Sequence, residues 1–223
     1  GARLDFPNDR IDAGVSFTEI QANFFPALGF VNRANIRQYE GRFNFRRRFD
    51  SGRVRSWVTG VEYLQVNSLS GTLESRLVTV TPLSVSSTQG DLLEVTALLN
   101  REVLRQPFTF PGGLTTAAGD YNFNRVKASL QTVGFRKLAL TLEGEAGNFF
   151  DGRRFDTRLG MSWQPNRYLL LRGQYATNRL DLPAGAFTAR VYALTGNLAI
   201  TPRWAWLNLA QYDNVSRRLG VNS

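Results

Sequence analysis

The chain of 223 residues contains no cysteine and no histidine. Their absence excludes disulfide bonds, a thiol nucleophile, a zinc site built from the usual ligands and any histidine-based acid–base pair. Long apolar segments are missing as well, because no run approaches the roughly 18 residues that a membrane-spanning helix needs. We therefore expect no bound metal and no cofactor.

Lysine is almost absent too, although the formal net charge is +9. Lys127 and Lys137 are the only two, so the positive charge comes almost entirely from arginine. These arginines recur at alternate positions and are interleaved with glutamate and aspartate, as on a polar sheet face with cross-strand ion pairs. They do not form the clustered basic surface that nucleic acid requires, so we expect no nucleic-acid partner.

Strict alternation of apolar and polar residues in 138–163 is the strongest signal in the sequence. Small or apolar residues at even positions from Leu138 to Ala146 alternate with a row that contains Glu143 and Glu145. The row from Phe155 to Trp163 alternates in the same way with charged residues. A period of two over this length predicts β-strands with one apolar and one charged face.

Similar strands are predicted nearly end to end after residue 35, and most have about 10–14 residues, as strands that cross a bilayer at a tilt do. The predicted ranges are 36–48, 54–66, 71–84, 91–102, 121–132, 136–147, 153–163, 167–178, 187–199, 203–213 and a further strand from about 217. We expect a single all-β segment over 1–223, an antiparallel up-and-down transmembrane β-barrel that is incomplete, with roughly 10–11 long strands. In it, 1–35 is an extended loop region and 36–223 an antiparallel meander.

The connections are predicted to alternate in length, which is typical of outer-membrane barrels. Short turns are expected at 49–53, 87–90, 132–135, 164–166 and 201–203, and long loops at 101–120, 147–154, 178–187 and after Tyr212. Aromatic residues end several apolar rows, where interfacial girdles would lie: Trp57, Tyr63, Phe155, Trp163 and Tyr175. A large soluble β-sandwich stays open as the alternative, since its core would also need apolar rows.

In the barrel, the charged faces would line the lumen. The expected lumen-facing charged ladder comprises Arg42, Arg46, Glu62, Glu94, Arg125, Lys127, Glu143, Glu145, Arg154, Asp156, Arg158 and Arg172. Pairing about a turn at 132–135 would set Arg125 opposite Glu143, with Arg154 or Arg158 within reach from the next strand. Such a ladder either fills and rigidifies the lumen or selects permeating solutes, as charged rings do in pores.

Catalysis is not expected from these residues. Glu143 and Glu145 share a strand face and resemble a glycosidase pair by residue type alone. Their arginine neighbours would keep both carboxylates charged and so remove the proton donor that such chemistry requires. The glycine-rich 112–120 lacks the Lys-Ser/Thr of a phosphate-binding loop. We predict a protein that is not an enzyme.

Several segments resemble an uncharacterised family of bacterial outer-membrane β-barrels, whose members carry the barrel C-terminal to a family-9-like carbohydrate-binding module. The resemblance rests on FPNDRIDAGVSFTEIQANFFPALGFVNRANIRQY (6–39), LRQPF (104–108), AGDYNFNRV (118–126), GNFFDGRR (147–154), RLDLPAGAFTARV (179–191) and QYDNVSRRLGVNS (211–223). It implies an internal fragment of the barrel, without the carbohydrate-binding module and the terminal strands. No catalytic residue can be transferred from the resemblance.

The resemblance implies a bacterial outer-membrane location, with outer-membrane lipid and saccharides as partners. Three functions stay open. The segment serves saccharide capture or uptake in the intact protein, it is a purely structural membrane anchor for the carbohydrate-binding module, or it is a soluble all-β binding protein.

Overall fold

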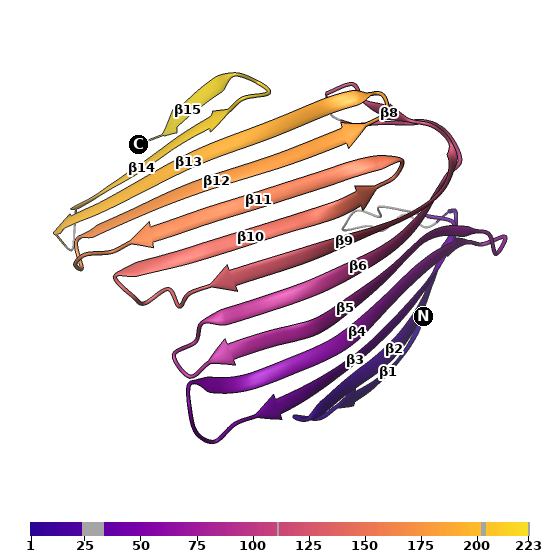
Figure 1. Ribbon diagram of the computed structural model, residues 1–223, viewed down its shortest axis with the longest axis horizontal. Helices are drawn as coiled ribbons and strands as arrows, with labels where there is room; N and C mark the ends of the chain where they lie inside the picture. Colours follow the sequence, from indigo (N-terminus) through magenta and orange to yellow (C-terminus); the bar gives the residue numbers. More distant parts are fainter. Residues whose placement is uncertain (24–33, 111, 202–203, 223) are drawn as a thin grey trace.

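A computed structural model describes residues 1–23, 34–110, 112–201 and 204–222. Thirteen strands form one antiparallel sheet in which each strand pairs with its neighbours along the sheet in sequence order (Figure 1). Among the described residues there is no helix that could cross a membrane. The prediction of an all-β antiparallel meander is confirmed.

The strands begin and end close to the predicted positions from residue 36 onwards. Their bounds are β1 (Ala2–Pro7), β2 (Ile11–Ile20), β3 (Ile36–Arg48), β4 (Val54–Ser68), β5 (Leu73–Ser87), β6 (Leu92–Leu104), β9 (Gly119–Gln131), β10 (Leu138–Phe149), β11 (Gly152–Trp163), β12 (Leu169–Leu182), β13 (Gly185–Thr201), β14 (Trp204–Asp213) and β15 (Arg218–Asn222). Two short strands, β7 (Phe108–Thr109) and β8 (Thr115–Thr116), form a separate hairpin between β6 and β9.

The prediction that 1–35 is an extended loop region is wrong for much of that segment. It contains β1 and β2, which pair with each other, and β2 also pairs with β3. A tight turn joins β1 to β2, and in it the Asn8 side chain accepts a hydrogen bond from the Arg10 N–H at 3.0 Å. Part of the predicted loop, 24–33, lies outside the described residues.

Two predicted long loops, 147–154 and 178–187, are also wrong. Strand β10 runs to Phe149 and β11 starts at Gly152, while β12 and β13 are separated only by residues 183–184. The backbone has positive φ at both hairpins, 50° at Phe150 in the first turn and 135° at Gly185, where β13 begins. The longest connections on this rim are therefore 21–35 and 105–118, and we call this rim the long-connection rim.

At the opposite rim, the short-connection rim, Asp91 connects two neighbouring turns. Its carboxylate accepts hydrogen bonds from the Val133 backbone N–H at 3.0 Å and from the Arg136 guanidinium at 2.8 Å. The Val133 N–H, followed by Arg136, lowers the pKa of Asp91 below its ordinary value. These contacts extend the β9–β10 connection over 132–137, two residues longer than the predicted turn.

Connection 105–118 folds back over the sheet at the long-connection rim. Its buried Leu114 packs with the ends of β9, β10 and β12, and the whole cluster comprises Leu114, Phe123, Phe149, Leu180 and Leu182, with Phe110, Tyr121, Phe150 and Phe187 against it. We call this set the rim cluster. It covers one side of the sheet at the ends of these strands, since all of its strand residues point the same way.

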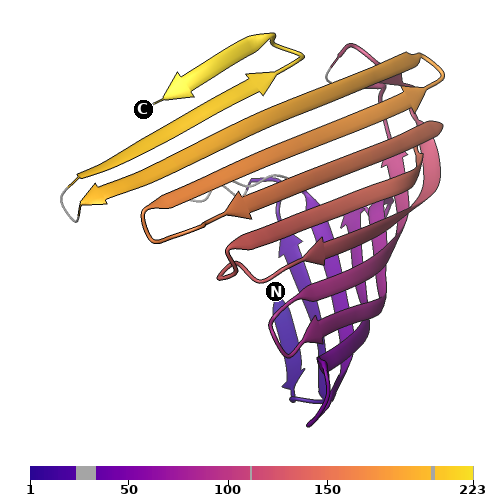
Figure 2. The ribbon, with the colours of Figure 1, turned by 60° about the vertical axis from the view of Figure 1, so that its left-hand side comes forward.

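The sheet is strongly curled, but it is not closed (Figure 2). Strands β1 and β15 form its two edges, and each pairs with a single neighbour among the described residues. The described residues therefore form a curled, open antiparallel sheet.

Candidate functional site

The two faces of the sheet differ sharply in chemistry. Residues directly opposite each other in an antiparallel pair lie on the same face, and alternate residues along a strand share a face. By this register all twelve residues of the predicted ladder lie on one face, the charged face: Arg42, Arg46, Glu62, Glu94, Arg125, Lys127, Glu143, Glu145, Arg154, Asp156, Arg158 and Arg172.

The charged face is the more shielded one. On β9 the Arg125 side chain is 14% exposed, whereas Val126, its neighbour on the opposite face, is 54% exposed. A curled sheet shields the side chains on its concave side, so the charged face is the inside of the curl seen in Figure 2. The apolar rows of the strands point outwards, whereas the rim cluster lies on the charged face.

Ion pairs connect β9 and β10 on the charged face. Arg125 Nη1 lies 2.6 Å from Glu145 Oε1, and Lys127 Nζ lies 3.1 Å from Glu143 Oε2. The prediction that Arg125 faces Glu143 is wrong, because Arg125 stands opposite Gly147 and Glu143 opposite Ser129. The six-residue connection at 132–137 shifts the register and so exchanges the partners.

The next strand adds further charges at the predicted place. Arg158 of β11 stands directly opposite Glu143, as expected. Arg154 forms its ion pair within its own strand, 2.6 Å from Asp156, and not with a glutamate of β10. Glu145 and Asp156 are themselves opposite each other. Two arginines and two acids, Arg125, Arg154, Glu145 and Asp156, thus form a compact and electrically balanced group.

Aromatic rings of the rim cluster cover this group. The Arg125 guanidinium carbon lies 5.7 Å from the Phe149 ring centroid, and that of Arg154 lies 5.2 Å from the same ring. Three buried polar atoms of this group, Arg125 Nε, Glu145 Oε1 and Asp156 Oδ1, have no hydrogen-bond partner among the described residues. Arg125 Nη1 and Glu145 Oε1 are close but misaligned for a hydrogen bond, so their contact is an ion pair. The hydrogen bond of this group joins Arg154 Nε to Asp156 Oδ2 at 2.6 Å.

A second charged group lies on β1 to β4. Arg42 binds Asp5 at 2.7 Å and Asp12 at 3.1 Å, and Arg42 stands opposite Glu62. Neither aspartate was predicted to belong to the charged face, because 1–35 was expected to be a loop region. Alternation of Arg3 and Asp5 with apolar neighbours was the signal that could have found them.

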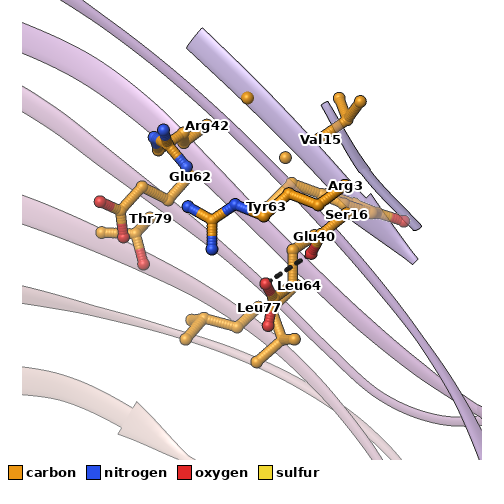
Figure 3. Close-up of a pocket in the computed structure, with 12 residues that line it drawn as sticks. Arg3, Val15, Ser16, Glu40, Arg42, Glu62, Tyr63, Leu64, Leu77 and Thr79 are labelled. Carbon is orange, nitrogen blue, oxygen red and sulfur yellow. Dashed lines mark hydrogen bonds between the residues drawn. The ribbon is translucent and has the colours of Figure 1, made fainter. Parts of the chain in front are cut away.

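A concavity of 330 Å³ adjoins this second group (Figure 3). Arg3, Glu40, Arg42 and Glu62 supply charge to it, and the Ser16 hydroxyl donates a hydrogen bond to Glu40 at 2.7 Å (Figure 3). Its volume is at the lower end of the range of about 300–1,000 Å³ found for small-molecule sites. Converging donors and acceptors of this kind suit a polar ligand rich in hydroxyls.

The remaining ladder residues lie apart from these groups. Arg46 is 3.7 Å from Asp9, near the short-connection rim. Glu94 stands opposite serines of β5 and β9, and Arg172 stands opposite Ser162 and a threonine of β13. In the part of the chain that the structure describes, no three acidic residues gather as a metal ion would require.

On the opposite, apolar face the residue types change from the short-connection rim to the long-connection rim. The chain has four tryptophans, and all lie on this face within three residues of a strand end at the short-connection rim: Trp57, Trp163, Trp204 and Trp206. Five of the seven tyrosines, Tyr39, Tyr63, Tyr175, Tyr192 and Tyr212, share the face. Three of them form a row across β12 to β14, with successive ring centroids 4.9 and 6.3 Å apart.

The tyrosines mark where this face changes from apolar to polar. On β3 the row Phe43, Gly41, Tyr39 continues into Arg37, and on β12 the row Leu171, Gly173, Tyr175 continues into Thr177 and then Arg179. Six arginines lie beyond the boundary, towards the long-connection rim: Arg37, Arg76, Arg101, Arg153, Arg179 and Arg190. We call them the arginine band.

Comparison of the chain with protein-family models, with curated proteins and with solved structures found no match.

Proposed function

We propose that this sheet is part of the wall of a β-barrel in the bacterial outer membrane, with its apolar face towards lipid and its charged face towards the lumen. The proposal rests on the residue types of the apolar face, which change from tryptophans at the short-connection rim, through apolar residues, to tyrosines and then arginines. Tryptophan and tyrosine concentrate at the two interfaces of membrane-spanning barrels, with an apolar band between them. The resemblance to outer-membrane barrels seen in the sequence points the same way.

The spacing of the aromatic residues supports the proposal. Trp57 and Tyr63 of β4 are six residues apart, and Trp204 and Tyr212 of β14 are eight apart. At about 3.3 Å per residue these spacings are roughly 20–26 Å along the strands, or about 15–20 Å of height at a tilt of about 40°. This height suits a thin membrane, and the bacterial outer membrane is thinner than average.

The proposal also requires closure. Backbone groups on the edges of β1 and β15 would be unpaired in lipid, at a cost of several kcal/mol each. Strands other than the thirteen described would therefore pair with both edges in the assembled barrel.

A non-enzymatic role follows from the charged face. Its best-shielded carboxylates, Glu145 and Asp156, are each 2.6 Å from an arginine nitrogen. Each of these two carboxylates is therefore engaged by an arginine of the same sheet face. The rim cluster and the balanced charges beneath it suit a rigid, filled section of the barrel, which is the role of a membrane anchor.

Quenching of tryptophan fluorescence by brominated lipid tests the orientation. In a background with the four tryptophans replaced by phenylalanine, Ala128→Trp and Ser129→Trp place the fluorophore on adjacent residues of opposite faces. After insertion of the protein into vesicles, we expect acyl-chain bromine to quench at position 128 and to have little effect at position 129. Equal quenching at both positions, or none at either, would contradict the proposal and favour a soluble β-protein.

The 330 Å³ concavity on the charged face favours a second function, saccharide capture or uptake. A lumen-facing site with serine, glutamate and arginine could exchange hydrogen bonds with sugar hydroxyls. Swelling of proteoliposomes in oligosaccharide solutions tests it: swelling that Arg42→Gln reduces supports uptake. A correctly inserted protein without swelling or sugar binding leaves the structural anchor as the function.

A further inference from the structure

The arginine band contains one position where two like charges face each other. Arg76 of β5 and Arg101 of β6 are directly opposite in the register, and Asn122 of β9 stands opposite Arg101. Like charges in directly opposed positions destabilise a sheet unless an anion compensates them. This arrangement lies on the apolar face, just beyond Tyr63 and towards the long-connection rim.

The protein supplies only one of the two counter-charges. Asp120 accepts two hydrogen bonds from Arg101, at 2.6 and 3.0 Å. Arg76 forms no ion pair with any residue in the described ranges, although other members of the band, Arg37 and Arg179, do. Arg76 interacts with Asp120 only at longer range than an ion pair, so its guanidinium has donors left for an anion.

A concavity of 340 Å³ lies between these side chains. Arg76, Arg101 and three asparagines line its polar part, and Tyr63, Val78 and Leu99 line its apolar part. The apolar part continues into the band between the aromatic rows. A ligand that fits both parts has an anionic head and an apolar tail.

We propose that this concavity binds the phosphate of an anionic membrane lipid, with Arg76 as the main contact and the acyl chains along Tyr63, Val78 and Leu99. Guanidinium groups suit phosphate because their planar fork donates two parallel hydrogen bonds. Asparagine amides add donors beside them. The inference rests on the proposed membrane location, since the headgroup level of a bilayer would coincide with the change from apolar to polar residues.

Counting lipid adducts by native mass spectrometry tests the inference. The protein in detergent micelles is titrated with phosphatidylglycerol, with zwitterionic phosphatidylcholine and with inorganic phosphate. We expect tight binding of phosphatidylglycerol and weak binding of the other two. Arg76→Gln should weaken phosphatidylglycerol binding about tenfold, the effect of losing about 1.4 kcal/mol of charge-assisted hydrogen bonding.

Arg153→Gln is the matched control, because Arg153 belongs to the same band and also lacks an ion pair among the described residues. It lies three strands from β6, roughly 14 Å away at about 4.8 Å per strand. That distance exceeds the screening length of about 8 Å at physiological salt. The control should therefore change the affinity by less than about twofold, since charge beyond the screening length contributes little.

Each outcome separates this inference from the proposed function. Equal weakening by Arg76→Gln and Arg153→Gln would overturn the site in favour of diffuse attraction, and binding of inorganic phosphate as tight as that of the lipid would overturn the lipid as ligand. If bromine quenching shows insertion but phosphatidylglycerol is not preferred, only the inference fails. If insertion itself fails, both fail.

Discussion

Replacing Arg125 by methionine should destabilise the protein far more than the same change at Lys127. Both residues lie on the charged face of β9, and each forms an ion pair with a glutamate of β10. The side chains of Arg125 and Glu145 are only 14% and 16% exposed, whereas those of Lys127 and Glu143 are 35% and 28% exposed. Arg125→Met therefore removes the cation of a shielded ion pair, and Lys127→Met removes the cation of a more solvated one.

The expected magnitudes follow from this exposure. Removing one partner of a buried ion pair costs about 3–5 kcal/mol, because the other charge stays buried without compensation. Residual exposure places Arg125→Met near the lower end, about 3 kcal/mol. Lys127→Met should cost at most about 1 kcal/mol, as solvated pairs do. Combining Arg125→Met with Glu145→Met should recover most of the loss, because Arg154 and Asp156 still balance each other.

Urea unfolding of the protein in detergent micelles, followed by tryptophan fluorescence, measures these differences. With a slope near 3 kcal/mol per molar urea, a loss of about 3 kcal/mol lowers the midpoint by about 1 M. Midpoints of Arg125→Met and Lys127→Met that agree within error would refute the reasoning, since they would show that the rim cluster does not exclude water from Arg125.

Three further predictions concern other parts of the sheet. Gly152→Ala should destabilise by about 2–3 kcal/mol, since its Cβ would lie 2.1 Å from a β12 carbonyl oxygen, and Gly144→Ala, with nothing within 4 Å, should be neutral in the same urea assay. The lowered pKa of Asp91 means that its contribution to stability is present above its ordinary value of 3.8 and is lost as pH falls through the lower folded value. Unfolding curves between pH 7 and pH 2 should therefore show a smaller acid-induced loss for Asp91→Asn, and an undiminished loss would contradict this. Phe149→Ala should cost about 3–5 kcal/mol from the rim cluster, whereas Phe135→Ala, at a residue 82% exposed, should leave the urea midpoint unchanged.

Strand positions were predictable because alternation is a local property of the chain. The rows around Leu138 and Phe155 are visible without any knowledge of neighbours, and the strands there differ from prediction by two residues or fewer. The face assignment of the charged ladder followed from the same periodicity.

Registers and turn lengths were harder to predict from the sequence, since they depend on contacts between distant residues. Asp91 holds Val133 and Arg136 from another turn. In the register that accompanies this contact, Arg125 stands opposite Gly147 and forms its ion pair with Glu145. The segment around Pro183 has the composition of a loop, yet pairing of β12 with β13 continues to Leu182 and Gly185. The partners of Arg42 were missed for a related reason, because they lie on strands in a segment with many turn-forming residues.

Sequential pairing has a consequence for how the protein reaches this structure. Each strand of the large sheet pairs only with strands adjacent to it in the chain, apart from the short hairpin inserted before β9. Contacts between nearby segments cost little loop-closure entropy and form quickly. The sheet can therefore grow one hairpin at a time from any starting point, and only its two edges, β1 and β15, would wait for pairing with strands outside the sheet.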